Sequence, residues 1–301
     1  MYIQKVKGST FCIDTGMTYV PFYKINDQEI IMLDSGWAQE EKEGIEALLE
    51  ENNLKVVGII CSHAHVDHIG NINHLKEKYN CIIAMSAYEA LVCSSNVNLK
   101  AYCSSSQTLS DVTDYFGHMV CETDIKISDN QESVYVSGIK FKIFHTPGHS
   151  PAHICIVTPD DVGYVADALI SYEVMENAKI PYSFILKKDL ESKKKLYDFK
   201  CSRYIVAHKA IYDDITKLIT DNIDFYKDRA LQICNFINSP MTMEDIIKNV
   251  IEKFNIRIGS AHKYALIETI VRFYVEYLKE IGMIDSIIEE RMLKYVKMEA
   301  Y

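Results

Sequence analysis

Short apolar runs alternate with charged helical segments along most of the chain. Val56–Ile60 and Tyr204–Ala207 are continuous apolar runs, typical of strands that are buried on both faces. Ile139–Phe144 alternates apolar and charged residues, which predicts a half-buried strand. Gln39–Asn52 and Lys187–Phe199 place apolar residues at helical spacing. This succession of strands and helices predicts an α/β fold.

Residues that can bind a metal follow directly after one of these runs. Beyond Val56–Ile60 the chain reads Cys-Ser-His-Ala-His-Val-Asp-His, so that His63, His65, Asp67 and His68 stand close together. Side chains at i and i+2 of an extended segment point the same way, so His63 and His65 can bind one ion. Asp67 and His68 follow the bend and can face a second ion. Imidazole and carboxylate ligands suit zinc, iron or manganese.

Three further candidates, His149, Asp167 and His208, each follow a later apolar run. Pro147 and Gly148 form a turn that can direct His149 back toward the site. Asp167 is a carboxylate able to bridge two cations. A lone histidine after a strand is more often structural, and Asp167 alone could cap a helix. Four strand-end clusters in one chain, taken together, predict a metal centre at one edge of the sheets.

The order His-x-His-x-Asp-His, then Thr-Pro-Gly-His, a strand-end Asp and a strand-end His resembles the metallo-β-lactamase superfamily of hydrolases. The segment Ile31–Gly36 also resembles the family's early strand, which ends in Asp-Ser-Gly near the metal site. The resemblance covers about the first three-quarters of the chain and implies a four-layer αββα sandwich. Two positions depart from the usual pattern, because Ala166 and Lys209 stand where the family usually has glycine.

The resemblance implies two divalent metal ions, for which we expect zinc before iron or manganese. The first ion would take His63, His65 and His149, the second would take Asp67, His68 and His208, and Asp167 would bridge them. It also implies a metal-dependent hydrolase, in which a hydroxide shared by the ions cleaves a small ester, thioester or lactone. Asp67 and Asp167 would be catalytic, by orienting the water or by relaying a proton.

Two other functions stay open on the sequence alone. A mononuclear iron oxygenase of the same fold would use two histidines and an aspartate, although the full second set of Asp67, His68 and His208 argues against it. A regulatory protein could keep the metal-binding fold without hydrolysis and contact a partner through its C-terminal region. One iron per chain would favour the oxygenase, and two ions would favour the hydrolase.

Residues 86–127 interrupt the regular succession of strands and helices. The segment is polar in parts and aromatic at Tyr102, Tyr115 and Phe116, so it is either a lid over the metal cleft or surface decoration. Three later aromatic residues are equally candidates for cavity walls or for plain core: Tyr172, Tyr182 and Phe184.

The C-terminal part of the chain changes character, and we expect a catalytic domain over residues 1–228 and a small, mostly helical domain over residues 229–301. Thr242 begins a helix by a capping pattern, a long helix covers Tyr264–Ile281, and Ile284–Lys297 predicts a two-stranded wing. This order resembles the winged-helix appendage of some superfamily members. Because acidic and basic side chains balance there, we expect it to serve packing, dimerisation or closure of the substrate cleft.

Composition narrows the class of protein further. The chain has 301 residues, of which 48% are hydrophobic and 25% charged, as in soluble globular proteins. A net charge of −10 argues against a nucleic-acid partner and favours a small-molecule substrate. Nine cysteines without paired spacing, no signal segment and no membrane span predict a cytoplasmic protein. The run Lys193–Lys195 is expected on a solvated helix face.

Overall fold

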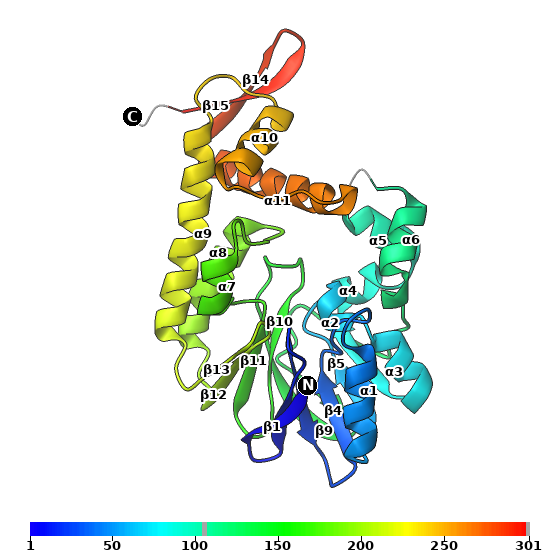
Figure 1. Cartoon of the computed structure of the whole chain (residues 1–301). Coiled ribbons are helices and arrows are strands. Elements are labelled where there is room, and N and C mark those ends of the chain that lie inside the picture. Colours follow the sequence, from blue (N-terminus) through cyan, green and yellow to red (C-terminus); the bar gives the residue numbers. More distant parts are fainter. Residues whose placement is uncertain (104–106, 299–301) are drawn as a thin grey trace.

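The computed structural model describes residues 1–103 and 107–298 and contains two large β-sheets that pack face to face (Figure 1). The first sheet has the spatial order β1 (Tyr2–Lys7), β2 (Thr10–Asp14), β3 (Tyr19–Lys24), β4 (Glu29–Leu33), β5 (Lys55–Ile60), β6 (Ile82–Ser86) and β7 (Ile125–Ile127). The second has the order β13 (Ala210–Tyr212), β12 (Arg203–Val206), β11 (Val162–Ala166), β10 (Ile154–Val157), β9 (Ile139–His145) and β8 (Ser133–Val136).

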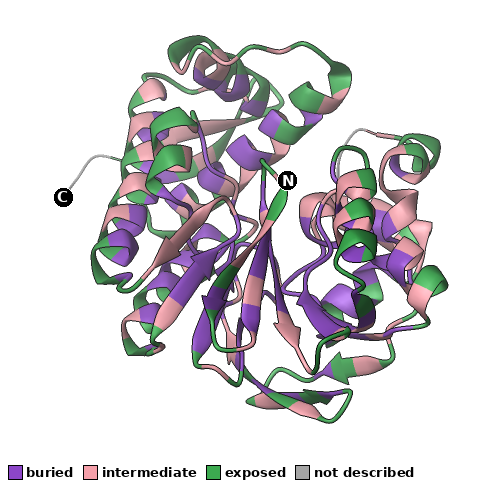
Figure 2. Ribbon diagram, turned by 60° about the horizontal axis from the view of Figure 1, so that its bottom comes forward, coloured by how far each residue is buried: buried purple, intermediate pink, exposed green. Residues whose placement is uncertain are grey.

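The apolar residues of a single strand serve two different cores. On β4, Ile31 and Leu33 face the layer between the sheets, whereas Ile30 and Met32 face the helices outside the first sheet. Successive side chains of a strand point to opposite faces, so a strand covered on both sides must be apolar throughout. Figure 2 accordingly shows the central strands largely in the colour of buried residues.

Helices cover the outer face of each sheet. The first sheet packs against α1 (Lys42–Glu51) and α3 (Ile72–Tyr79) through apolar residues at helical spacing. The second packs against α8 (Leu186–Lys195), the short turn η2 (Leu196–Asp198) and α9 (Thr216–Phe236). The order helix, sheet, sheet, helix confirms the predicted four-layer α/β sandwich.

Lys193 departs from the prediction of a solvated lysine face, and that prediction is wrong at this position. Its side chain is fully buried, and its Nζ lies 2.7 Å from Oδ1 of the equally buried Asp189. The ammonium also lies 4.4 Å from the ring centre of Tyr226 on α9. Asp189 and Lys193 are four residues apart on the inner face of α8, so they neutralise each other inside the protein. Lys194 and Lys195 are exposed as predicted.

Residues 86–127 form a helical insert that ends in a strand. The insert contains α4 (Ala87–Val92), α5 (Asn96–Cys103), α6 (Leu109–Phe116) and the turn η1 (Gly117–Met119). It then returns to the first sheet, where β7 pairs with β6 in parallel. Buried residues of α5 and α6, Leu99 and Val112, belong to the core outside the first sheet.

The C-terminal region packs onto the sandwich without a break in the core. It contains α10 (Met243–Lys253), α11 (Ala261–Glu280), β14 (Ile284–Glu289) and β15 (Met292–Lys297). The short helix α7 (Tyr172–Asn177) packs against α9, farther from this region (Figure 1). The predicted helix, long helix and two-stranded hairpin are therefore present. The division between residues 228 and 229 stays a prediction; in the structure this position lies within α9, and one apolar cluster joins α9, α10 and α11 to the second sheet. None of the described helices is both long and apolar enough to cross a bilayer.

Candidate metal centre

Five strands, β4, β5, β9, β11 and β12, bring their carboxyl ends to one edge of the sandwich. β9 and β11 run in the same direction, because each pairs antiparallel with β10. β4 runs parallel to β5, and β11 runs parallel to β12, so the loops after these strands lie together. A hydrogen bond from the Ile154 amide to the Ser62 carbonyl (3.0 Å) joins the loop after β5 to the second sheet. The side chains after these strands therefore face one another across the gap between the two sheets.

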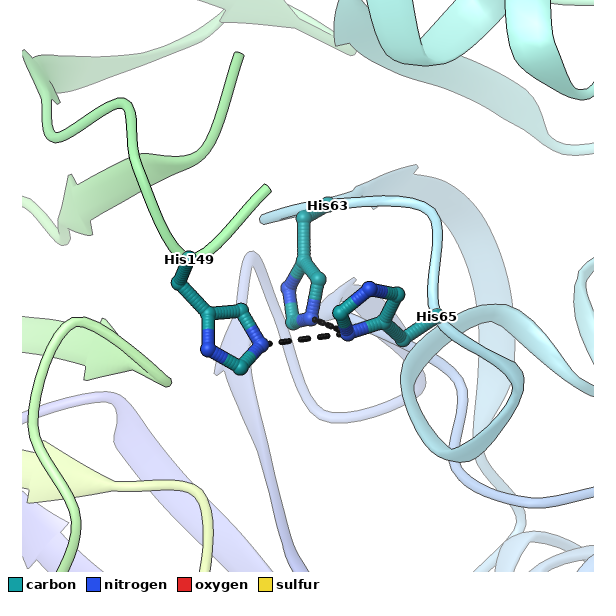
Figure 3. A group of neighbouring side chains, drawn as sticks. All are labelled: His63, His65 and His149. Atoms are coloured by element: carbon teal, nitrogen blue, oxygen red, sulfur yellow. Dashed lines mark hydrogen bonds between the residues drawn. The ribbon is translucent and has the colours of Figure 1, made fainter. Parts of the chain in front are cut away.

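His63, His65 and His149 form the first cluster (Figure 3). His63 Nε2 lies 2.8 Å from His65 Nδ1, and His149 Nε2 lies 3.1 Å from the same atom. Figure 3 shows the three rings turned toward one another, two from the loop after β5 and one from the loop after β9. One candidate ligand atom from each residue lies within 4.8 Å of the others, so a single cation can contact all three.

Asp67, His68 and His208 form the second cluster. Asp67 and His68 lie on the single turn of α2 (Val66–Ile69), and His208 follows β12. His208 Nε2 lies 3.5 Å from Asp67 Oδ2, and His68 Nε2 lies 3.8 Å from the same oxygen. These residues were predicted to share an ion, and the structure brings them within reach of one.

Asp167 lies between the two clusters. Its carboxylate oxygens are 3.3 Å from His149 Nε2, 3.4 Å from His208 Nε2 and 3.5 Å from His68 Nε2. The residue before it, Ala166, has φ of 45°, a left-handed conformation that turns the chain sharply at the end of β11. A residue with a side chain is strained in this conformation, whereas glycine is not. This explains why glycine is usual at this position in the family that the sequence resembles.

The turn that carries His149 is held by α8. The Ile185 amide donates to the Gly148 carbonyl (2.8 Å), and the Ser192 hydroxyl donates to the Pro147 carbonyl (2.7 Å). Gly148 has φ of 139°, and a Cβ atom there would come within 2.1 Å of the Asp189 amide nitrogen. Only glycine permits this close approach, so α8 fixes the position of His149.

Asp34 positions His68 from behind. Its Oδ2 lies 2.8 Å from His68 Nδ1 and accepts hydrogen bonds from the hydroxyls of Tyr164 and Ser62, both at 2.7 Å. Its Oδ1 accepts from the Ser62 amide at 2.7 Å. The Nδ1–H of His68 is thus directed to the carboxylate, so Nε2 is the ring nitrogen that faces the centre.

Glu89, on α4 of the insert, connects the two ligand loops. Its carboxylate accepts hydrogen bonds from the Ser150 hydroxyl (2.7 Å), the Ala152 amide (2.9 Å) and the Ala64 amide (3.1 Å). Burial raises its pKa, while these three donors act in the opposite direction. The insert therefore stabilises the loop of His63 and His65 against the loop of His149.

Burial determines the protonation state of the first cluster. It lowers the pKa of His65 to about 4 and holds the pKa of His63 and His149 well below the ordinary range. Desolvation penalises the charged imidazolium, so these three rings are neutral near pH 7. A neutral imidazole has the lone pair that a metal ligand needs.

The second cluster has the opposite electrostatics. Burial alone would lower the pKa of His208 and His68, but the nearby charges of Asp167 and Asp67 raise it, to about 9 for His208 and well above the ordinary value for His68. The two carboxylates therefore favour positive charge in this part of the centre.

Three buried atoms of the candidate ligands make no hydrogen bond to any described residue: His68 Nε2, Asp167 Oδ1 and His149 Nδ1. The first two face the centre and lie 3.5 Å apart. Burying a polar atom without a partner costs free energy, so such atoms usually have a role. An imidazole nitrogen and a carboxylate oxygen are both ligands of divalent cations such as zinc. A third possible ligand group, His63, His68 and Asp167, overlaps the first two. The residues present thus fit a pair of divalent ions.

A cavity of about 600 Å³ opens above the centre. The insert supplies Leu99, Tyr102, Tyr115 and Phe116 to the cavity wall. This supports the interpretation of the insert as a lid and argues against mere surface decoration. Tyr182 also lines the cavity, and Phe184 stacks on Tyr102 with ring centres 5.5 Å apart. The candidate wall residue Tyr172 is not among the lining residues; it lies at the start of α7 and bonds Asp221 on α9. Five of the seven candidate ligands border the cavity: His65, Asp67, His149, Asp167 and His208.

All seven predicted site residues thus lie at one edge of the sandwich, whereas four residues that support them were not predicted. Ser62, Tyr164 and Glu89 make the contacts described above, and His153 lies with its ring centre 4.9 Å from that of His63. The Asp167 amide donates to His153 Nε2 (3.3 Å), and burial lowers the pKa of His153 to about 3, so this ring is a neutral structural residue. The sequence could have indicated the supporting roles of Ser62 and Tyr164, since each is a hydroxyl residue in or next to an apolar strand. No feature of the sequence indicated the role of Glu89.

A family model described as "Metallo-beta-lactamase superfamily" matches residues 13–208 of the chain. An uncharacterised protein of Aquifex aeolicus is 32% identical over 130 residues, which are 42% of this chain and 53% of that protein. A hydroxyacylglutathione hydrolase of Rhodopseudomonas palustris is 29% identical over 126 residues, which are 42% of this chain and 38% of that enzyme. The chain thus spans about half or less of the length of these relatives.

Two solved structures have the same fold over nearly the whole chain. A β-lactamase domain protein from Burkholderia ambifaria superposes with a TM-score of 0.72 and 15% identity, covering 98% of this chain and 94% of that one. A metallo-β-lactamase family protein from Thermus thermophilus gives a TM-score of 0.69 and 16% identity, covering 93% and 94%. At such low identity these structures show the fold, including the C-terminal region, and nothing about substrate.

Proposed function

The chain belongs to the metallo-β-lactamase superfamily, and we propose that it is a metal-dependent hydrolase that cleaves a small ester, thioester or lactone. The observation that carries this proposal is the convergence of seven histidine and aspartate residues from four strand ends on one buried centre. Two of its atoms, His68 Nε2 and Asp167 Oδ1, are buried and unsatisfied among the described residues, as expected of ligands.

We assign the residues to two divalent cations, with zinc expected first. His63, His65 and His149 would hold one ion, Asp67, His68 and His208 the other, and Asp167 would contact both. When bound, such ions supply a water of lowered pKa and a Lewis acid for the substrate carbonyl. The neutral state of the first three imidazoles and the carboxylates of the second cluster support this division.

The chain's own residues would position the substrate and move a proton. Asp67 and Asp167 line the floor of the cavity, so their carboxylate oxygens can accept a proton from the attacking water and return it to the leaving group. Cys103 also lines the cavity, but burial raises its pKa to about 11, so it is a neutral thiol and a poor nucleophile.

The relatives named as hydroxyacylglutathione hydrolases support a thioester, among the three bond types, as the first to test.

The deciding experiment combines His63→Ala and His65→Ala and measures both bound metal and turnover. Elemental analysis of the purified wild-type protein should find two divalent ions per chain, and a panel of ester, thioester, lactone and phosphodiester substrates should reveal hydrolysis. The double variant should lose both the metal and the turnover. A matched control is His74→Ala, because His74 is a partly exposed histidine on α3 that contacts Glu46, away from the centre.

Three results would contradict the proposal. Turnover that persists in the double variant would exclude a metal-assisted reaction at this centre. A single iron per chain together with oxygen consumption would favour the iron oxygenase. A metal-replete protein that is inert toward the whole panel and co-purifies with a partner protein would favour the regulator.

A further inference from the structure

The cavity above the metal centre is apolar almost throughout. Of the described residues that line it, the charged ones are Asp67, Asp167 and, in the metal-free protein, His208 on the floor, together with Lys263 at the first turn of α11. Its upper wall consists of α5, α6 and α11, a set of elements that we call the apolar roof. A substrate with several charged groups would leave them without partners in such a cavity, which is costly.

The helix α11 contributes one continuous apolar face to the roof. Leu266, Ile270 and Phe273 are spaced by four and three residues, so they lie on the same side of the helix, and all three line the cavity. In Figure 1, α11 lies below α10 and the β14–β15 hairpin and extends across the upper part of the molecule to the side of α5 and α6. α11 buries its main apolar face, which includes Ile270, in the core of the second sheet, and beside that face Leu266 and Phe273 border the space above the candidate ligands.

Aromatic rings extend this apolar surface down to the metal centre. The Phe184 ring lies 5.5 Å from that of Tyr102 and 5.0 Å from that of Phe273, which links the insert to α11. Tyr182 packs 5.9 Å from Phe273 and 5.0 Å from His65. A chain of ring contacts thus leads from the roof to a candidate ligand. A bound apolar group can contact its members Tyr102, Tyr182 and Phe273, which line the cavity, while Phe184 supports them from behind.

The roof is closed at its far end by contacts between the insert and α11. Gln107 Nε2 lies 3.0 Å from His262 Nδ1, and the Tyr115 ring stacks on the His262 ring with centres 4.1 Å apart. These contacts hold the two walls at a fixed separation. The cavity volume of about 600 Å³ lies within the usual range for sites that enclose a small organic ligand, and it accommodates a chain on the order of ten carbons.

We propose that this cavity binds a medium-length fatty acyl group, so that the substrate is an acyl ester or thioester whose acyl chain lies under the apolar roof. The inference rests on the hydrolase function proposed above and narrows its substrate class. In the reaction the acyl–sulfur or acyl–oxygen bond breaks, the oxygen of water joins the acyl carbon, and a proton passes to the leaving thiol or alcohol. No oxidant or reductant is needed.

The test is a chain-length series on metal-replete protein. N-acetylcysteamine thioesters with acetyl, butyryl, hexanoyl, octanoyl, decanoyl and dodecanoyl groups present the same uncharged leaving group throughout. We expect kcat/KM to rise about four-fold for each methylene that enters the cavity and then to level off. Glutathione thioesters of the same acyl groups should be poorer substrates, because their charged groups find few partners. A flat or falling series, or a preference for glutathione thioesters, would overturn the inference while leaving a hydrolase.

A substitution that fills the cavity makes the test specific to the roof. Ile270→Trp should lower kcat/KM for the decanoyl thioester at least ten-fold more than for the acetyl thioester. The matched control is Leu231→Trp, because Leu231 is an exposed apolar residue on α9, outside the cavity lining, and its substitution should leave the chain-length profile as in the wild type. Equal losses for both substrates in Ile270→Trp would contradict a role in chain selection.

A binding measurement separates this inference from the proposed reaction. Decanoate binding is measured by calorimetry with the chelator-treated protein, in which no turnover can contribute. If the protein hydrolyses nothing, the reaction proposed above fails, but decanoate binding that Ile270→Trp weakens would still support the acyl cavity. Absence of decanoate binding to the folded wild-type protein would overturn it.

Discussion

The seven candidate ligands, which we call the metal floor, and the apolar roof above them are built by different physical means. The residues of the metal floor lie in segments that follow strands. Hydrogen bonds hold His68 to Asp34 and hold two of the ligand loops to Glu89. The apolar roof is held mainly by packing of rings and aliphatic side chains, with the contact of Gln107 and His262 at its end. The floor is therefore suited to one fixed chemistry, whereas the roof can change its shape by substitution.

The two regions also differ in their relation to the superfamily. The family match covers residues 13–208 and thus all seven ligands, but α11 lies beyond it. The chemistry comes from the shared part of the chain, and half of the roof comes from outside it. Family membership therefore predicts the type of reaction better than it predicts the substrate. Four experiments can break or sharpen this contrast.

The largest change in stability is expected from the buried pair of Asp189 and Lys193, which lies on α8, the helix that supports the turn of His149. Lys193→Met leaves the Asp189 carboxylate buried without its partner, so the free energy of unfolding should fall by about 3–5 kcal/mol. Urea denaturation of the metal-free protein measures this change. Lys188→Met is the control, since Lys188 forms an exposed pair with Glu191 at 3.5 Å and should change stability by less than about 0.5 kcal/mol. A loss of similar size in both variants would show that α8 does not depend on the buried pair.

Asp34→Asn tests the floor itself. An amide in place of the carboxylate would present a donor to His68 Nδ1–H, so metal affinity should fall about 10–100-fold. Turnover at limiting metal should decrease equally for short and long acyl groups. Competition with a chelator measures the affinity, and Asp160→Asn serves as control because Asp160 makes similar bonds to Ser9 and Thr10 away from the centre. A changed chain-length profile in Asp34→Asn would break the separation of floor and roof.

Tyr102 lies where the two regions meet. Its hydroxyl is 3.3 Å from His65 Nε2, while its ring belongs to the roof and stacks on Phe184. Tyr102→Phe removes one hydrogen bond, so kcat/KM should fall about two- to ten-fold for every acyl length. Tyr102→Ala should also weaken the preference for long chains, because the ring is lost. If both variants had the same profile, the ring would not form part of the acyl cavity.

The smallest effect concerns the end of the roof. Burial and the charge of Lys263 lower the pKa of His262 below its ordinary value of 6.5. Neutral His262 therefore contributes its full stabilisation above about pH 6.5, and this contribution decreases as the pH falls toward the lower folded-state pKa. His262→Phe should destabilise the protein by about 0.5 kcal/mol at neutral pH and by less at about pH 5.5, as measured by calorimetry. A difference that increases on acidification would contradict this assignment.

The fold and the metal floor were largely predictable from the sequence, whereas several of their supports were not. Strand ends and the Pro147-Gly148 turn located the ligands, because residue type and local spacing carry that information. Three consecutive lysines suggested a solvated face, yet Lys193 is buried because Asp189 lies four residues earlier on the same helix face. Glu89 lies within the insert, where neither periodicity nor spacing separates a buried carboxylate from a solvated one.

By itself the sequence determined the two-sheet architecture and the identity of the candidate ligands, since apolar periodicity and strand-end polar residues are local properties of the chain. Only the tertiary structure decided that Leu266 and Phe273 line a cavity, and that Ile270 borders both this cavity and the core of the second sheet. The sequence pattern of an apolar helix face is the same whether that face lines a cavity or packs into a core. The difference depends on whether another element covers it, and here α5 and α6 stand far enough from α11 to leave the space between them open.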